Sequence, residues 1–215
     1  MKILIDNGHG SNTKGKSSPD GRLREYAWAR ECAKRLVASL KQKGYDAELI
    51  VPETWDVKLQ TRVSRVNNIC KAVGARNCLL VSIHNNAGGN GAKWMEACGW
   101  SVFVSKNASE NSKKLARMLT VEAMKRELMG NRSVPLQKYW TWSWTNKDIY
   151  ILRNTACPAV LTENMFQDHK GDVDYLLSEA GMTELVDLHV EGITKYIDFV
   201  EISNVRQSNK FDCSH

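Results

Sequence analysis

Apolar and polar positions alternate along the chain in two different rhythms. Short apolar runs that suit β-strands lie at 2–6, 45–51, 78–84, 100–105, 149–152 and 159–163. Elsewhere apolar residues return every three or four positions, which predicts helices over about 22–43, 57–73, 109–129, 173–179 and 182–200. Strands that alternate with helices are typical of α/β proteins. We therefore expect a single domain with a twisted, mostly parallel sheet of about six strands.

Three polar residues stand at the carboxyl ends of predicted strands. His9 follows the first strand, His84 ends the third and Glu163 ends the last. In an open parallel sheet these ends share one edge, and ligands bind in the crevice outside it. Glu25 lies in line with the apolar stripe of the first predicted helix, near its start. We therefore expect two imidazoles and two carboxylates to converge at this edge.

Two histidines and two carboxylates match the chemistry of a zinc hydrolase. Zinc in such sites takes three protein ligands from His and Asp or Glu, and keeps a fourth position for water. The set therefore supplies three ligands and one carboxylate that acts on the water. Each residue alone also has an ordinary explanation: a hydrogen-bonded surface histidine, a first-turn acid that favours the helix dipole, or a strand-end charge. Their joint placement at one edge is what favours a metal site.

The remaining polar candidates are less clearly placed. Asp6 lies three residues before His9, and either orients an imidazole from behind the metal ligands or makes a strand-end hydrogen bond to loop amides. His189 lies on the apolar stripe of the last predicted helix, so we expect a packed core histidine. His169 lies in a polar segment and His215 ends the chain, and neither is assigned a role.

A tryptophan-rich segment, 139–144, precedes the fifth predicted strand. Trp140, Trp142 and Trp144 alternate with other residues and share one face if the segment is extended. One interpretation is a hairpin or flap whose indoles pack onto the domain. The other is an aromatic wall that binds sugar rings or a peptide stem, because flat apolar faces with a polar edge suit amphipathic ligands. The pattern leaves both interpretations open.

Composition and charge narrow the range of partners. The 215 residues include 30 Lys and Arg against 24 Asp and Glu, a net charge of +6 without a dense basic run, so we expect no nucleic-acid binding. A mild positive field attracts other anionic polymers, including a cell wall. The six cysteines form no C-x-x-C pair, which indicates buried free thiols rather than a disulfide or zinc-finger framework.

The chain ends add expectations about location. No apolar run approaches a membrane span, and the short run at 2–6 is far from a signal peptide, so we expect synthesis in the cytoplasm. Residues 201–215 are polar and lack periodicity, which indicates a loose tail or a surface-docked extension. We also expect a monomer.

Six short motifs follow one another in a recognisable order. They are Asp6-Asn7-Gly8-His9-Gly10, Leu23-Arg24-Glu25, Arg62-Val63 with Asn67, Ser82-Ile83-His84-Asn85-Asn86-Ala87, Leu152-Arg153-Asn154 and Pro158-Ala159-Val160-Leu161-Thr162-Glu163. Together they resemble the zinc-dependent N-acetylmuramoyl-L-alanine amidases. The resemblance spans about residues 1–198, which predicts a catalytic domain over that range and a C-terminal tail at 199–215.

The resemblance implies a fold, a site and a substrate. It implies a mostly parallel sheet with helices on both faces, one zinc ion bound by His9, Glu25 and His84, and Glu163 as the catalytic carboxylate. The implied substrate is the amide between the lactyl group of N-acetylmuramic acid and L-alanine of the peptidoglycan stem. We expect zinc-activated water with Glu163 as general base, and a donor such as Asn85 at the oxyanion.

The chain also departs from the family pattern. After the catalytic Glu the family commonly continues with Gly-Phe, whereas this chain has Asn164-Met165-Phe166, so Asn164 joins the three tryptophans as a substrate-binding candidate. A zinc peptidase acting on another peptide or amide bond and a non-catalytic cell-wall-binding module stay open as alternatives. An enzyme that cuts the wall without an export signal indicates a phage or prophage endolysin, which acts after release or lysis.

Overall fold

The computed structural model describes residues 1–131 and 149–211, with side chains up to residue 202. Within these residues one five-stranded sheet has the order β2-β1-β3-β5-β4. The strands are β1 Lys2–Asn7, β2 Asp46–Leu49, β3 Cys78–Asn86, β4 Ser101–Phe103 and β5 Ala159–Phe166. Strands β2, β1, β3 and β5 pair in parallel, and β4 pairs antiparallel with β5 at the edge. The expected mostly parallel sheet is confirmed.

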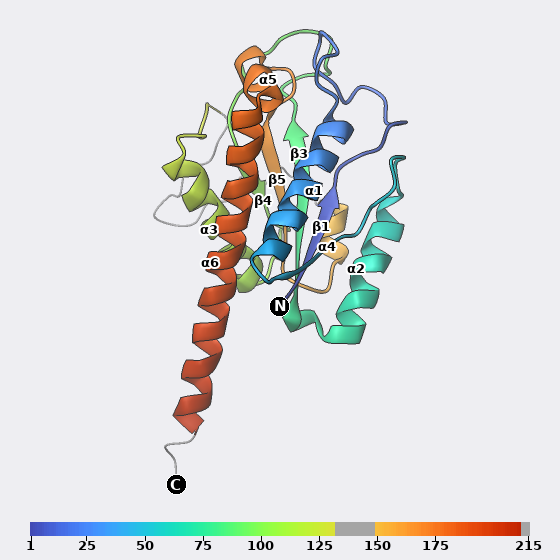
Figure 1. The fold of residues 1–215 in the computed structure, drawn as a ribbon. Helices are drawn as coiled ribbons and strands as arrows, with labels where there is room; N and C mark the ends of the chain where they lie inside the picture. The colour runs from blue at the N-terminus through green and yellow to red at the C-terminus, as the bar shows by residue number, and fades with distance from the viewer. Residues whose placement is uncertain (132–148, 212–215) are drawn as a thin grey trace.

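Helices cover both faces of this sheet (Figure 1). They are α1 Glu25–Gln42, α2 Leu59–Val73, α3 Glu110–Lys125, α4 Tyr150–Asn154, α5 Lys170–Leu177 and α6 Glu179–Phe211, with a short 3-10 turn at Ala75–Asn77. Two apolar clusters, one on each face, form the core. One joins the sheet to α1, α3 and α6, and the other joins it to α2 and α4.

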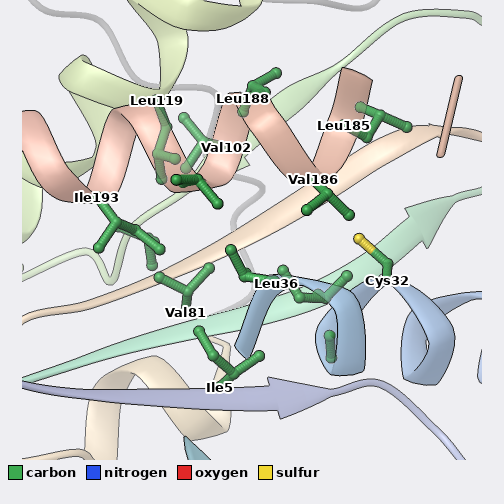
Figure 2. Packing of buried hydrophobic residues seen from close by; sticks show 14 of the residues in the cluster. Ile5, Cys32, Leu36, Val81, Val102, Leu119, Leu185, Val186, Leu188 and Ile193 are labelled. Atoms are coloured by element: carbon green, nitrogen blue, oxygen red, sulfur yellow. The ribbon is translucent and has the colours of Figure 1, made fainter. Parts of the chain in front are cut away.

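Strand alternation decides which cluster each side chain joins. Ile5 and Val81 point to the first face, where Figure 2 shows them beneath Leu36 of α1 and Val186 and Ile193 of α6. Their neighbours along the strands point the other way, toward α2. Both faces of the central strands are therefore buried, which explains why those strands are continuous apolar runs. Among the described helices, none has the length and apolar character needed to cross a bilayer.

The predicted strand at 149–152 is wrong, and the sheet formed by the described residues has five strands and not about six. This segment forms the short helix α4, Tyr150–Asn154, whose Ile151 and Leu152 pack into the second apolar cluster with α2. The helix is held locally, since Asn154 donates its side-chain amide to the carbonyl of Tyr150 at 2.8 Å. Four apolar residues in a row do not distinguish a strand from one buried helical turn.

The last helix is longer than its apolar pattern predicts. It runs to Phe211, through residues that were expected to form a loose tail or a docked extension from 201 onward. In Figure 1 its final turns project beyond the sheet. No glycine or proline follows Gly192, so the chain lacks the usual helix-ending residues. Apolar residues recur every three or four positions only where one side of a helix is buried. The last turns of α6 leave the core and lack this pattern, although their backbone is helical.

The described cysteines agree with the expectation of free thiols. The five cysteines within the described residues are unpaired. Cys32, Cys70, Cys78 and Cys157 are buried, and Cys98 is partly exposed. Burial raises the pKa of the Cys32 thiol to about 12, so it stays protonated and acts as a small apolar group.

Candidate metal centre and active site

The carboxyl ends of β1, β3 and β5 bring the predicted residues to one edge of the sheet. These strands are neighbours, and His84 on β3 is the register partner of Glu163 on β5. His9 lies two residues beyond the end of β1, and Glu25 is the first residue of α1. The long loop from β1 turns the chain back so that this helix starts over the same edge. Residues distant in the sequence thus meet in one small volume.

His9, Glu25 and His84 form a compact donor set. Nε2 of His9 lies 3.4 Å from Oε1 of Glu25, and Nδ1 of His84 lies 3.0 Å from the same oxygen. The two imidazoles meet edge to face, with ring centroids 5.1 Å apart. Among the described residues this is the group of three whose ligand atoms all lie within 4.8 Å of one another. Ligand atoms around a tetrahedral zinc ion are separated by roughly 3.3 Å, so the spacing fits.

The burial of Glu25 supports the same interpretation. Its carboxylate is almost fully buried, and Oε2 has no hydrogen-bond partner among the described residues. A buried carboxylate oxygen without a partner is costly unless a cation or a donor compensates it. The other oxygen, Oε1, does have partners, since it contacts both imidazoles and accepts a hydrogen bond from the backbone N–H of Asn85 at 3.2 Å. The Lys16 ammonium lies 3.9 Å from Oε2, which is beyond hydrogen-bond distance, so this buried oxygen can still serve a bound cation.

A glycine allows His84 to approach the first strand closely. A Cβ atom at Gly8 would lie 2.3 Å from Cε1 of His84, a separation that no side chain tolerates. Gly10 is packed as tightly, since a Cβ there would lie 1.9 Å from the backbone nitrogen of Asp56. These two glycines therefore serve close packing around His9.

Two arginines fix the backbone of His9, which has the left-handed φ of 58°. The guanidinium of Arg30 donates to the carbonyl of His9 at 2.9 Å, and that of Arg62 donates to the same carbonyl at 3.3 Å. Left-handed backbone costs a non-glycine residue about 1–2 kcal/mol, so it needs such support. The sequence signal for Arg62 was its place on the buried stripe of α2, in line with Val66 and Cys70. Arg30 has no comparable signal.

Asp6 acts through Arg62 and not through an imidazole. Nη1 of Arg62 donates to Asp6 at 2.7 Å and to the carbonyl of Asn7 at 2.6 Å, and the Ser82 hydroxyl donates to the other oxygen of Asp6. Both members of the ion pair are buried. Neither role first considered for Asp6, contact with an imidazole or with loop amides, describes these bonds. Asp6 holds the arginine that holds the loop of His9.

Asn85 and Asn164 form hydrogen bonds that hold Glu25 and the ends of β3 and β5 in place. The Asn85 side chain donates to the carbonyl of Asn164 at 2.6 Å, and its backbone N–H serves Glu25. The Asn164 side chain donates to the carbonyl of His84 at 3.1 Å and accepts from the indole of Trp100 at 3.0 Å. Asn164 is fully buried, so the structure gives it a place inside the fold rather than on a binding surface.

The pKa values of Glu25 and Glu163 are shifted in opposite directions. Burial raises the pKa of Glu25, but hydrogen bonds from His84 and His9 outweigh this and hold it below its usual range. Burial raises the pKa of Glu163 to about 7; the His84 charge opposes this rise and the Glu25 charge adds to it. Oε2 of Glu163 is buried without a hydrogen-bond partner among the described residues. One carboxylate is therefore ionised and the other is poised to exchange a proton near neutral pH.

The environment of His84 links metal binding to pH. Burial lowers the pKa of this imidazole, but its hydrogen bond to Glu25 and the charges of Glu25 and Glu163 outweigh burial and raise it. A metal ligand must be neutral imidazole, so binding a cation here releases a proton.

A cavity of about 600 Å³ opens beside the two histidines. Its floor includes Asp6, His84 and Leu161 on three adjacent strands, and its walls come from 56–60 at the start of α2 and from 149–151 at α4. This volume suits a group of small-molecule size. The edge with the donor set therefore has space on the α2 side for a substrate.

Other predicted residues lie away from this edge or outside the described part. His189 is buried in the core as expected, and its Nε2 lies 2.9 Å from the hydroxyl of Thr162. His169 precedes α5 and accepts a hydrogen bond from the backbone N–H of Asp172. Trp140, Trp142 and Trp144 lie outside the described residues.

The sheet, its helical layers and the His-Glu-His set define an α/β protein with a candidate metal-dependent hydrolase site. A family model described as N-acetylmuramoyl-L-alanine amidase matches residues 3–195, so the chain belongs to this family of hydrolases. The Endolysin of Bacillus phage SPP1 is 26% identical over 214 residues, which is 98% of this chain and 71% of that protein. The N-acetylmuramoyl-L-alanine amidase CwlM of Bacillus licheniformis is 25% identical over 91% of this chain and 68% of its own.

A solved structure agrees with both the fold and the family. The N-acetylmuramoyl-L-alanine amidase from Clostridium difficile 630 has 27% sequence identity and a TM-score of 0.73, covering 92% of this chain and 96% of that one. The catalytic domain of the CD27L endolysin also shares the fold, with a TM-score of 0.65 at 23% identity, over 91% of this chain and 97% of its own. The α/β fold expected from the sequence is therefore that of the family.

Proposed function

We propose that the chain is a zinc-dependent enzyme that hydrolyses the amide between the lactyl group of N-acetylmuramic acid and L-alanine in peptidoglycan. The observation that supports this most strongly is the placement of His9, Glu25 and His84 around one point, with Glu163 on the adjacent strand. Family membership supplies the amide and the polymer. All four side chains come from one chain, so a monomer suffices.

His9, Glu25 and His84 would hold the zinc ion. When bound, such an ion polarises a scissile carbonyl and lowers the pKa of water toward about 7. The protein must keep Glu25 ionised and both histidines in place, and the hydrogen bonds described above do this. Arg30, Arg62 and Asp6 act at one remove, by fixing the backbone of His9.

Glu163 is the proposed general base and acid. Its buried oxygen has no competing partner within the described residues, and its raised pKa lets it both accept and release a proton near neutral pH. We propose that it takes the proton of the attacking water and returns it to the amine of L-alanine. A half-buried carboxylate next to His84 is well placed for this exchange, because both side chains leave the same face of the sheet.

The oxyanion assignment of Asn85 changes in the light of these contacts. Its side-chain amide already donates to Asn164, and its backbone N–H donates to Glu25. We therefore propose that Asn85 orients a metal ligand. The proposed binding surface is the cavity between α2 and α4, and the tryptophan segment stays a candidate for an aromatic wall.

Product analysis of digested peptidoglycan tests the proposed bond. Purified wall is incubated with the protein, and the released fragments are identified by mass spectrometry. We expect stem peptides with a free L-alanine amino terminus and glycan strands with a free lactyl carboxylate. Cleavage inside the stem would identify a zinc peptidase instead. A protein that sediments with wall and releases no fragment would be a non-catalytic binding module.

A further inference from the structure

Lys16 places a positive charge at the active site from the loop between β1 and α1. Its Nζ lies 3.9 Å from Oε2 of Glu25, while its side chain is 37% exposed. The backbone of this loop is fixed, since the carbonyl of Lys16 accepts from the N–H of Glu25 at 3.0 Å and Ser17 bridges to Arg24. The lysine is therefore anchored at the site by its backbone, and its side chain is partly exposed.

The contact with Glu25 does not use up this charge. A separation of 3.9 Å between Nζ of Lys16 and Oε2 of Glu25 is too long for a hydrogen bond. The closer contacts of Glu25, with His84, His9 and Asn85, are all made by its other oxygen, Oε1. The neighbouring arginines differ from Lys16, because Arg30 and Arg62 donate to backbone carbonyls around His9. Within the described residues no hydrogen bond engages the Lys16 ammonium, so its three hydrogens are available to another acceptor.

Lys16 also lies near the proposed base but outside the cavity. Burial raises the pKa of Glu163, and Lys16 is among the charges that oppose the rise. The residues that line the cavity come from β1, β3, β5, α2, α4 and the segments before these two helices, and include His9 of the β1–α1 loop but not Lys16. Lys16 is therefore a charged group beside the donor set that is separate from the residues lining the cavity.

The proposed substrate has a matching asymmetry of charge. On the acyl side of the scissile amide, the lactyl ether and the N-acetylated sugar are neutral. On the amine side, L-alanine is followed by an acidic residue whose α-carboxylate is either free or amidated. Lys16 lies near Glu163, which is proposed to protonate the leaving amine. The substrate carboxylate nearest to Lys16 is therefore the one on the amine side of the scissile bond.

We propose that Lys16 binds the free α-carboxylate of the residue that follows L-alanine, and so makes the enzyme selective for stems in which that carboxylate is not amidated. This inference rests on the proposed function. It assigns the peptide to the Lys16 side of the site and leaves the cavity between α2 and α4 to the uncharged sugar side.

The test compares two muropeptides that differ only at the second stem residue, D-glutamate in one and D-isoglutamine in the other. We expect wild-type protein to prefer the acidic muropeptide about fivefold in kcat/KM, the size of one partly exposed ion pair, and to lose this preference as ionic strength rises. Lys16→Met should remove the preference, mainly through a higher KM, with zinc content unchanged. Lys16→Arg should keep it. Lys14→Met, at an exposed lysine of the same loop, is the matched control and should behave as wild type.

Four outcomes would overturn the assignment. Equal cleavage of both muropeptides by wild type would show that the site does not recognise this carboxylate. Loss of zinc from Lys16→Met, or an equal fall on both muropeptides with the preference kept, would show that Lys16 serves Glu25. If wild type cleaves neither muropeptide at the L-alanine amide, the proposed function fails and the inference fails with it.

Discussion

His84 and Glu163 are register partners on the neighbouring parallel strands β3 and β5. Because side chains alternate across a strand, partners in register leave the same face of the sheet side by side. A candidate metal ligand and a candidate proton carrier are therefore adjacent without any contribution from a flexible loop. The side-chain amide of Asn164 on β5 donates to the carbonyl of His84 on β3, which helps to fix the register of these two strands.

Replacing Glu163 by glutamine tests its role in proton transfer. Glutamine keeps the shape but cannot take a proton from water, so we expect Glu163→Gln to lower hydrolysis by about 10²- to 10⁴-fold while the protein stays folded and keeps its zinc. Release of wall fragments and metal analysis on the same sample measure this. Glu96→Gln, at an exposed carboxylate, is the control and should keep full activity. A zinc-loaded Glu163→Gln protein with near wild-type activity would refute the assignment.

The buried ion pair of Asp6 and Arg62 should contribute more to the free energy of unfolding than the half-exposed pair of Glu53 and Arg65. Both arginines lie on α2. Side chains of the first pair are 2% and 3% exposed, so Arg62→Met leaves a buried carboxylate uncompensated and should cost about 3–5 kcal/mol in the free energy of unfolding. Arg65→Met should cost about 1 kcal/mol or less. Urea denaturation of both variants gives the comparison. Equal losses would contradict the account of how His9 is held.

His189 should make the fold sensitive to acid. Its Nδ1 donates to the carbonyl of Leu185, and in the neutral imidazole Nε2 accepts from the Thr162 hydroxyl. Burial lowers its pKa from 6.5 to about 4. The unfolded chain binds this proton first, so the stability is complete above pH 6.5 and is lost as pH falls toward 4.

The loss attributable to His189 should reach about 2–3 kcal/mol by pH 4.5. The His189→Leu protein is expected to be less stable at neutral pH, because the Thr162 hydroxyl loses its acceptor, but to lose less stability on acidification. Free energies of unfolding for both proteins between pH 7 and 4.5 measure the difference in slope. Parallel curves would show that His189 does not cause the acid sensitivity.

The sequence predicts the residues of the site better than the buried residues that hold them in place. Histidines and glutamates at strand ends and at a helix start are visible in one sequence, because parallel topology brings such ends together. The partner of Asp6 is not visible, since Arg62 lies 56 residues away, and neither its motif nor its place on an apolar stripe says which residue it binds. The strand predicted at 149–152 fails for a related reason: a short apolar run reports burial and not backbone shape.

The domain boundary predicted near residue 198 has a direct test. The family match ends at residue 195, and α6 continues to Phe211. Tyr196 and Ile197 are buried in the core, whereas Ile202 is exposed. We expect a chain that ends after Val200 to keep its melting temperature and its activity on wall. A truncated chain that unfolds or loses activity would show that the last turns of α6 belong to the catalytic domain.

The central claim is that His9, Glu25 and His84 bind one zinc ion. Equilibrium dialysis against zinc, followed by metal analysis, tests it in wild-type protein and in Glu25→Gln, with Glu31→Gln at an exposed position of the same helix as control. We expect one zinc per chain for wild type and the control, and at least about tenfold weaker binding for folded Glu25→Gln, because a neutral amide replaces the one anionic ligand. Folded wild-type protein that binds no zinc, or binds it as tightly after Glu25→Gln, would contradict the account.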